Sequence, residues 1–255
     1  MKRKLSIYFA VLAVAASFVV PANLAYAESE SSADSESVAE LSAEWWQWAL
    51  SIPTPVNPLL DNGANCMVGQ HGEFWFLTGA FAGGTVMRTC SVPENVALFF
   101  PLINSVTFDT PGVCGQPANQ RLSVKELRTT SAALIDGATN LSVEVDGEPI
   151  EHSKRVRSKV FYVALPEDNV FDAPCTGANL GNVPAGIYSP SVDDGFYAKV
   201  DRLKAGTHTL HFHSENTSQD FVEDVTYTLN VVPVTGGSKE RHKREHKDDR
   251  QERED

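Results

Sequence analysis

Two histidines separated by one residue are the first candidates for chemistry in this sequence. His211 and His213 flank Phe212 in a run, Thr207 to His213, whose polar and apolar residues alternate as in a half-buried strand. Residues i and i+2 of a strand share a face, so the two imidazoles point the same way. Paired imidazoles on one face are a common start for a zinc site.

The next predicted strand, Val225 to Val231, decides whether a carboxylate joins the two histidines. If Phe212 lies opposite Val225 on the core face, His213 lies opposite Asp224. Two imidazoles and a carboxylate, with Glu215 nearby, suit zinc or another divalent ion. The alternative is that they are solvent-facing groups of an outer strand. The candidate metal ligands are therefore His211, His213 and Asp224, and no cofactor other than a divalent metal is indicated.

Aromatic side chains form the second set of candidates, because sugar rings stack on flat aromatic faces. Pairing Phe196 with Phe212 would place Tyr197 opposite His211 on the same outer face. Trp46 and Tyr188 are further candidates for such a ligand-binding platform. The alternative is that the aromatic residues fill the core, which the apolar neighbours of Trp45, Trp48 and Trp75 favour.

Two further patterns are weaker. Asp193-Asp194 is a candidate calcium-binding loop, although it lacks the ordered spacing of an EF-hand and also suits a solvated loop. Residues 242–246 match the H-x-x-E-H zinc-protease signature, but they lie in a charged segment with no apolar face, so we interpret the match as coincidence. The sequence contains no G-x-S-x-G, P-loop or dinucleotide-binding fingerprint.

Four cysteines remain after the predicted leader, and an even number in an exported chain indicates disulfides. Four cysteines allow three connectivities. We favour Cys66 with Cys90 and Cys114 with Cys175, since this choice keeps the shorter loop local.

The elements that position these residues are mostly short strands. Alternation predicts strands at residues 196–200, 207–213 and 225–231, and bulky or alternating runs predict others at 73–77, 85–90, 96–100, 141–145 and 160–165. Ser123-x-x-Glu126 is a capping box that begins a helix, and Ser42 could cap a short helix that Pro53 ends. The sequence therefore predicts a mainly β fold. We expect an antiparallel β-sandwich, jelly-roll or immunoglobulin-like, with a short N-terminal helix and one inserted helix.

The ends of the chain differ from its body. The chain begins with a predicted signal peptide: three basic residues, an apolar run over 5–20 and Ala25-Tyr26-Ala27, with cleavage before Glu28. The alternative is a membrane anchor, but a spanning helix needs about 20 apolar residues and this run is shorter. We assign residues 1–27 to the signal peptide, 28–40 to an acidic Ser-rich spacer, 41–235 to one β-sandwich body, and 236–255 to a charged, disordered tail.

The charge of the body limits its partners. Outside the leader and the segment 238–255, 11 basic and 26 acidic residues remain, a net charge of −15. Such a body repels nucleic acid and anionic lipid headgroups, so we expect neither as a partner. No later run is long and apolar enough for a transmembrane segment after signal cleavage.

Three segments carry a resemblance: EWWQWALSIPTPVNPLLDNGANCMVGQHGEFWFLTG, CSVPENVALFFPLINS and DDGFYAKVDRLKAGTHTLHFHSEN. Together they resemble a group of exported bacterial proteins with a Trp-rich N-terminal segment. The resemblance implies a secreted or periplasmic bacterial protein and carries over no activity. We therefore expect a non-enzymatic binding or structural protein of the periplasm or cell exterior, with a glycan as one candidate ligand. The alternative is a metal-dependent hydrolase or lyase that acts on an extracellular polymer through His211, His213 and Asp224.

Overall fold

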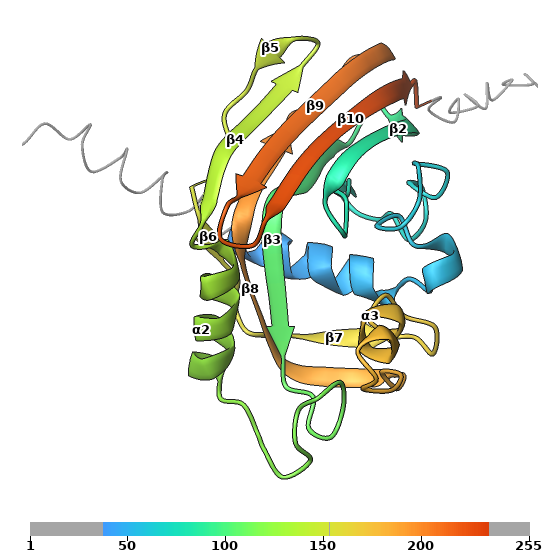
Figure 1. Ribbon diagram of the computed structural model, residues 1–255. Helices are drawn as coiled ribbons and strands as arrows, with labels where there is room; N and C mark the ends of the chain where they lie inside the picture. Colours follow the sequence, from blue (N-terminus) through green and yellow to red (C-terminus); the bar gives the residue numbers. More distant parts are fainter. Residues whose placement is uncertain (1–37, 153, 235–255) are drawn as a thin grey trace, which may run out of the picture.

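The structure, a computed structural model, describes residues 38–152 and 154–234. The predicted signal peptide, the tail with its H-x-x-E-H match and most of the spacer lie outside the described residues. Two five-stranded sheets carry the described part, so the protein is mainly β (Figure 1). No helix in 38–152 or 154–234 is long and apolar enough to cross a membrane.

Sheet A has the strand order β1-β3-β8-β6, with β7 also paired to β8. Its strands are β1 (Phe74–Phe76), β3 (Ala97–Phe108), β6 (Val156–Arg157), β7 (Phe161–Leu165) and β8 (Gly186–Val200). Sheet B has the order β2-β10-β9-β4-β5. Its strands are β2 (Gly84–Pro93), β4 (Ala138–Val145), β5 (Glu148–Pro149), β9 (Gly206–Asn216) and β10 (Phe221–Val232).

Both sheets are mixed, which corrects the expectation of purely antiparallel sheets. β1 pairs with β3 in parallel, and β2 pairs with β10 in parallel. A parallel pair needs a long connection, and here it joins segments that lie far apart in the sequence. The jelly-roll or immunoglobulin-like connectivity stays a prediction.

The two sheets pack face to face over one shared core. Leu98, Phe100 and Leu102 of β3 meet Leu210 and Phe212 of β9, and all five side chains are buried. The rings of Phe100 and Phe212 lie 4.9 Å apart between centroids. The alternation that the sequence shows in β9 therefore does face a hydrophobic core.

The other face of sheet A is covered by a helix over residues 38–51, followed by the 3-10 turn η1 (Thr54–Val56). The helix begins before Ser42, so Ser42 is not its N-cap, and it includes residues 38–40 of the predicted spacer. It ends before Pro53, as expected. Trp45 and Trp48 pack with Phe76, Phe99 and Tyr197 in a second hydrophobic cluster.

β3 and β8 extend beyond the edge of sheet B, and α2 (Val124–Ile135) packs against this extended part of sheet A (Figure 1). The predicted capping box is present: Ser123 accepts from the Glu126 amide, and the Glu126 side chain accepts from the Ser123 amide. Ser131 on the buried face of α2 donates to the carbonyl oxygen of Ser105 in β3. A short helix that the sequence did not predict, α3 (Asp172–Gly177), lies beside β7 (Figure 1).

Candidate functional site

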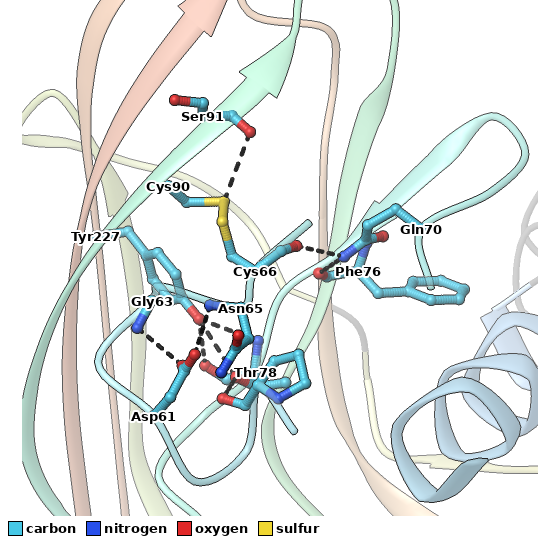
Figure 2. Close-up of a disulfide and its surroundings, with 11 residues drawn as sticks. Asp61, Gly63, Asn65, Cys66, Gln70, Phe76, Thr78, Cys90, Ser91 and Tyr227 are labelled. Atoms are coloured by element: carbon cyan, nitrogen blue, oxygen red, sulfur yellow. Dashed lines mark hydrogen bonds between the residues drawn. A yellow bond between two sulfur atoms is a disulfide. The ribbon is translucent and has the colours of Figure 1, made fainter. Parts of the chain in front are cut away.

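Both predicted disulfides are confirmed: Cys66 is bonded to Cys90, and Cys114 to Cys175. Figure 2 shows the first bond, which ties the loop after the N-terminal helix to β2. Beside it, the Tyr227 hydroxyl donates to the Thr78 carbonyl oxygen (2.9 Å) and accepts from the Thr78 amide (3.2 Å). The Cys66–Cys90 disulfide therefore lies beside the hydrogen bonds that hold Thr78, and with it the segment leading to Gly79 and Ala80, against β10.

The histidine cluster forms as its register predicts. Asp224 pairs with His213 in the β9–β10 ladder, and Val225 pairs with Phe212. The Oδ2 atom of Asp224 lies 3.2 Å from Nδ1 of His213 and 3.4 Å from Nε2 of His211. The second ring nitrogen of His213 lies 3.1 Å from Oε1 of Glu215.

This cluster lies on the outer face of sheet B and is open to solvent. The side chains of His211, His213 and Asp224 are 33%, 23% and 36% exposed. Among the described residues, no group of three or more His, Cys, Asp or Glu side chains is arranged to hold a metal ion. The geometry is that of a hydrogen-bonded surface cluster, in which the imidazoles already contact the carboxylates.

The predicted position of Tyr197 beside His211 is wrong. β8 pairs with β3 in sheet A, whereas β9 pairs with β4 and β10 in sheet B. Alternation shows which face of a strand is buried, but it does not show which strand lies alongside. Tyr197 is therefore fully buried, and its ring stacks on Phe99 with centroids 5.2 Å apart.

The three aromatic candidates do not form one platform. Trp46 is 5% exposed, and Tyr197 has no exposed surface, so neither offers an open ring face for a sugar. Tyr188 lies elsewhere, where its ring contacts Phe108 and its hydroxyl donates to the Pro184 carbonyl oxygen. Burial of Trp46 and Tyr197 follows from the N-terminal helix, which covers this face of sheet A.

Trp46 and Tyr197 meet instead at a buried carboxylate, Asp193. Its Oδ1 accepts from Trp46 Nε1 (2.8 Å) and from the Tyr197 hydroxyl (2.7 Å). Its Oδ2 is buried and accepts no hydrogen bond within the described residues, since the nearby Ser42 hydroxyl donates to the Ala39 carbonyl oxygen. Burial raises the pKa of Asp193 to about 7, although the Tyr197 and Trp46 hydrogen bonds act to lower it.

The calcium-loop interpretation of Asp193-Asp194 is wrong, because both residues lie within β8. Consecutive strand residues point to opposite faces. Asp194 accordingly turns away from Asp193 and forms ion pairs with Arg155 (2.5 Å) and Arg157 (3.3 Å). The hydrogen bonds to Asp194 raise the pKa of Arg155, which keeps this guanidinium charged.

A cleft opens along the free edge of β3, and Trp46 forms part of its wall. β1 pairs with β3 only over Ala97–Phe99, so beyond Phe99 this edge has no partner strand among the described residues. A lobe of about 370 Å³ contacts four consecutive β3 residues, 103–106. Consecutive residues face opposite sides of a sheet, so a space that touches all four meets the strand at its edge.

A second lobe of about 120 Å³ shares five residues with the first, and we call the two together the β3-edge cleft. The shared residues are Trp46, Phe81, Ile103, Asn104 and Phe221. The side chain of Asn104 donates to the Tyr197 hydroxyl (3.2 Å), which links the cleft wall to the Asp193 cluster. Gly195 makes this possible, because a Cβ there would lie 2.7 Å from the Cβ of Asn104.

Glu223 of β10 lines the smaller lobe. It is 4% exposed, and its Oε1 accepts a short hydrogen bond from the Ala80 amide. Gly79 allows this approach, because a Cβ at that position would lie 1.8 Å from Oε1. Burial raises the pKa of Glu223 to about 8, against the opposing effects of the Ala80 amide and of Arg88.

Sequence motifs missed the cleft because its residues come from seven separate segments. The sequence held one signal of the cleft. Every second residue of β10 from Val225 to Val231 faces the core, and Glu223 falls in the same alternation, which places a carboxyl group on the core face. Buried acids with raised pKa values gather at functional sites. An apolar cleft with a few polar groups is the usual form of a small-molecule site.

Comparison with known proteins adds no assignment. No family model, curated protein or solved structure gives a significant match to this chain. Any function must therefore be argued from the geometry of the site itself.

Proposed function

We propose that this protein is an exported binding protein without catalytic activity, and that the β3-edge cleft binds a small organic ligand with an apolar body. One observation carries the proposal: Trp46, Phe81 and Phe221 line both lobes of the cleft, and a single buried acid, Glu223, lines the smaller lobe. Apolar walls supply affinity by excluding water from the ligand, and a few polar groups fix its orientation.

The surroundings of the cleft support this proposal. The larger lobe, at about 370 Å³, falls within the range of small-molecule sites, and the smaller lobe of about 120 Å³, which Glu223 lines, shares five residues with it. Both disulfides suit an oxidising compartment, in agreement with the predicted signal peptide. The alternative, a metal-dependent hydrolase or lyase, would depend on His211, His213 and Asp224, and no comparable enclosure surrounds these side chains.

The proposal is tested with small aromatic compounds of anionic, neutral and cationic type, screened by ligand-observed NMR against the mature chain. We expect Phe81→Ala to weaken any compound that binds in the cleft by about tenfold, because it removes one aromatic wall. Leu122→Ala is the matched control. Leu122 does not line the cleft but lines a neighbouring cavity of about 280 Å³ beside the Cys114–Cys175 bond, which shares only Val106 and Phe171 with the larger lobe.

Two results would overturn the proposal. The first is that no compound binds at millimolar concentration. The second is that binding depends on Leu122 and not on Phe81, which would move the ligand to the other cavity.

A further inference from the structure

The charge inside the β3-edge cleft is unusual. Glu223 is the one ionisable side chain among the residues that line its two lobes. Its Oε1 is engaged by the Ala80 amide, whereas its Oε2 has no hydrogen-bond partner within the described residues. A side chain that is 96% buried thus keeps one oxygen for a group that enters the cleft.

The nearest positive charge does not fill this role. Arg88 of β2 is buried, but its guanidinium donates to the carbonyl oxygens of Thr78 (3.0 Å) and Asp61 (3.2 Å). It also lies over the ring of Tyr227, 5.7 Å from the centroid. No ion pair joins Arg88 to Glu223 in the described structure, so the acid has no direct counter-charge.

The walls of the cleft favour a cation as well. Aromatic faces attract ammonium groups, and the attraction grows where water is excluded. Phe81 and Phe221 line both lobes of the cleft and are only partly buried, so their rings are available for such a contact. The net charge of −15 on residues 28–237 adds a long-range attraction for cations.

We infer that the ligand of the β3-edge cleft is an organic cation, a protonated amine on an apolar or aromatic body, whose ammonium group donates to Oε2 of Glu223. This inference rests on the proposed function, because it names the ligand class of the same site. Binding requires the carboxylate form of Glu223, so a proton leaves Glu223 as the cation enters. Since the pKa of Glu223 is raised to about 8 in the empty cleft, binding of the cation is coupled to pH.

The test compares three probes of similar shape, 2-phenylethylammonium, 2-phenylethanol and 3-phenylpropionate, by isothermal titration calorimetry on the mature chain. At pH 8 we expect the ammonium to bind at least tenfold more tightly than the alcohol, and the carboxylate not to bind. Below pH 8 the ammonium affinity should fall by up to about tenfold per pH unit, with proton release visible in buffers of different ionisation enthalpy.

Two variants assign this behaviour to Glu223. Glu223→Gln keeps the acceptor for the Ala80 amide, so the fold should survive while the preference for the ammonium and the proton release disappear. The charged groups that face Glu223 or border the cleft wall are Arg88 and, behind Trp46, Asp193. Because Asp193 also titrates near pH 7, Asp193→Asn must retain the pH dependence if Glu223 is the source.

The outcomes separate the two proposals. Equal affinity for ammonium and alcohol, both weakened by Phe81→Ala, would overturn the cation inference and leave the binding cleft in place. Tighter binding of the alcohol would indicate that Glu223 acts as a neutral hydrogen-bond donor, which also overturns it. Binding of none of the probes, together with a negative screen, would refute the proposed function itself.

Discussion

Glu223 and Asp224 are neighbours on β10, yet they have opposite environments. Asp224 points outward, is 36% exposed and contacts two histidines. Glu223 points inward, is 4% exposed and has one partner, the Ala80 amide. β8 differs, because Asp193 and Asp194 are both buried: Asp193 accepts from Trp46, whereas Asp194 forms an ion pair with Arg155.

The contrast shows that residue type and spacing are poor guides to chemistry without burial. A solvent-exposed carboxylate next to imidazoles is screened by water, and such pairs contribute about 0–1 kcal/mol. A buried carboxyl group loses hydration, so its protonation state and its partners become coupled to the rest of the structure. The motif of His211, His213 and Asp224 contains the exposed kind of carboxylate, and the cleft contains the buried kind, Glu223.

The largest expected effect comes from Trp46, which joins the cleft to the buried acid. Trp46→Ala removes a buried ring and one donor to Asp193, so we expect a loss of about 3–5 kcal/mol in the free energy of unfolding. Trp46→Phe keeps most of the ring and should cost about 1–3 kcal/mol, the share of the hydrogen bond. Urea denaturation of both variants measures the difference, and a Trp46→Phe variant as stable as the parent would show that the bond to Asp193 has no stabilising role.

The second effect concerns the space beside Glu223. Gly79→Ala places a methyl group 1.8 Å from the present position of Oε1, so the carboxyl group must move or the loop must shift. We expect a loss of about 1–3 kcal/mol in stability, typical of overpacking, and weaker binding in the cleft. Gly177→Ala is the matched control, because nothing lies within 4 Å of its added Cβ. A Gly79→Ala variant as stable as the parent would mean that Glu223 is not held in this position.

The third effect is a pH dependence of stability. The pKa of Asp193 is raised from 3.8 to about 7 and that of Glu223 from 4.5 to about 8, so the folded state keeps protons that the unfolded state has lost. Stability therefore falls as pH rises from about 4 to about 8, at up to about 1.4 kcal/mol per pH unit for each group, and is level above that range.

Asp193→Asn should reduce this slope and raise stability above pH 7, because the amide can still accept from Trp46 and Tyr197 without a buried charge. Asp201→Asn, at an exposed position, should leave the slope unchanged. Thermal unfolding of the parent and both variants between pH 4 and pH 9 provides the measurement. A rise in parental stability over this range would contradict the buried placement of both acids.

Local patterns predicted much of the fold. The capping box of α2 and the β9–β10 register agree with the sequence because each depends on residues near in the chain. The disulfides agree because the pairing that keeps the shorter loop local is the one present. The parallel pairs β1–β3 and β2–β10 were missed, since no local pattern specifies a partner strand. The cleft was missed for the same reason. Only the position of Glu223 in the alternation of β10, on the same face as the core residues, indicated a buried acid.

The smallest effects are expected on the outer face, where His211→Ala and His213→Ala test the metal site directly. Both imidazoles are partly exposed, so each substitution should change the free energy of unfolding by less than about 1 kcal/mol. A metal ligand needs a free ring nitrogen. Both nitrogens of His213 already face carboxylate oxygens of Asp224 and Glu215.

We therefore expect the parent and both variants to retain the same amount of zinc after dialysis, as measured by mass spectrometry of the bound metal. Zinc could still enter if Asp224 and Glu215 rotated from the imidazoles and turned their oxygens to a shared ion. Such a rearrangement would give one equivalent of zinc in the parent and none in either folded variant. That result would reverse the comparison between the two faces of β10, because the exposed motif, and not the buried acid, would then be the functional one.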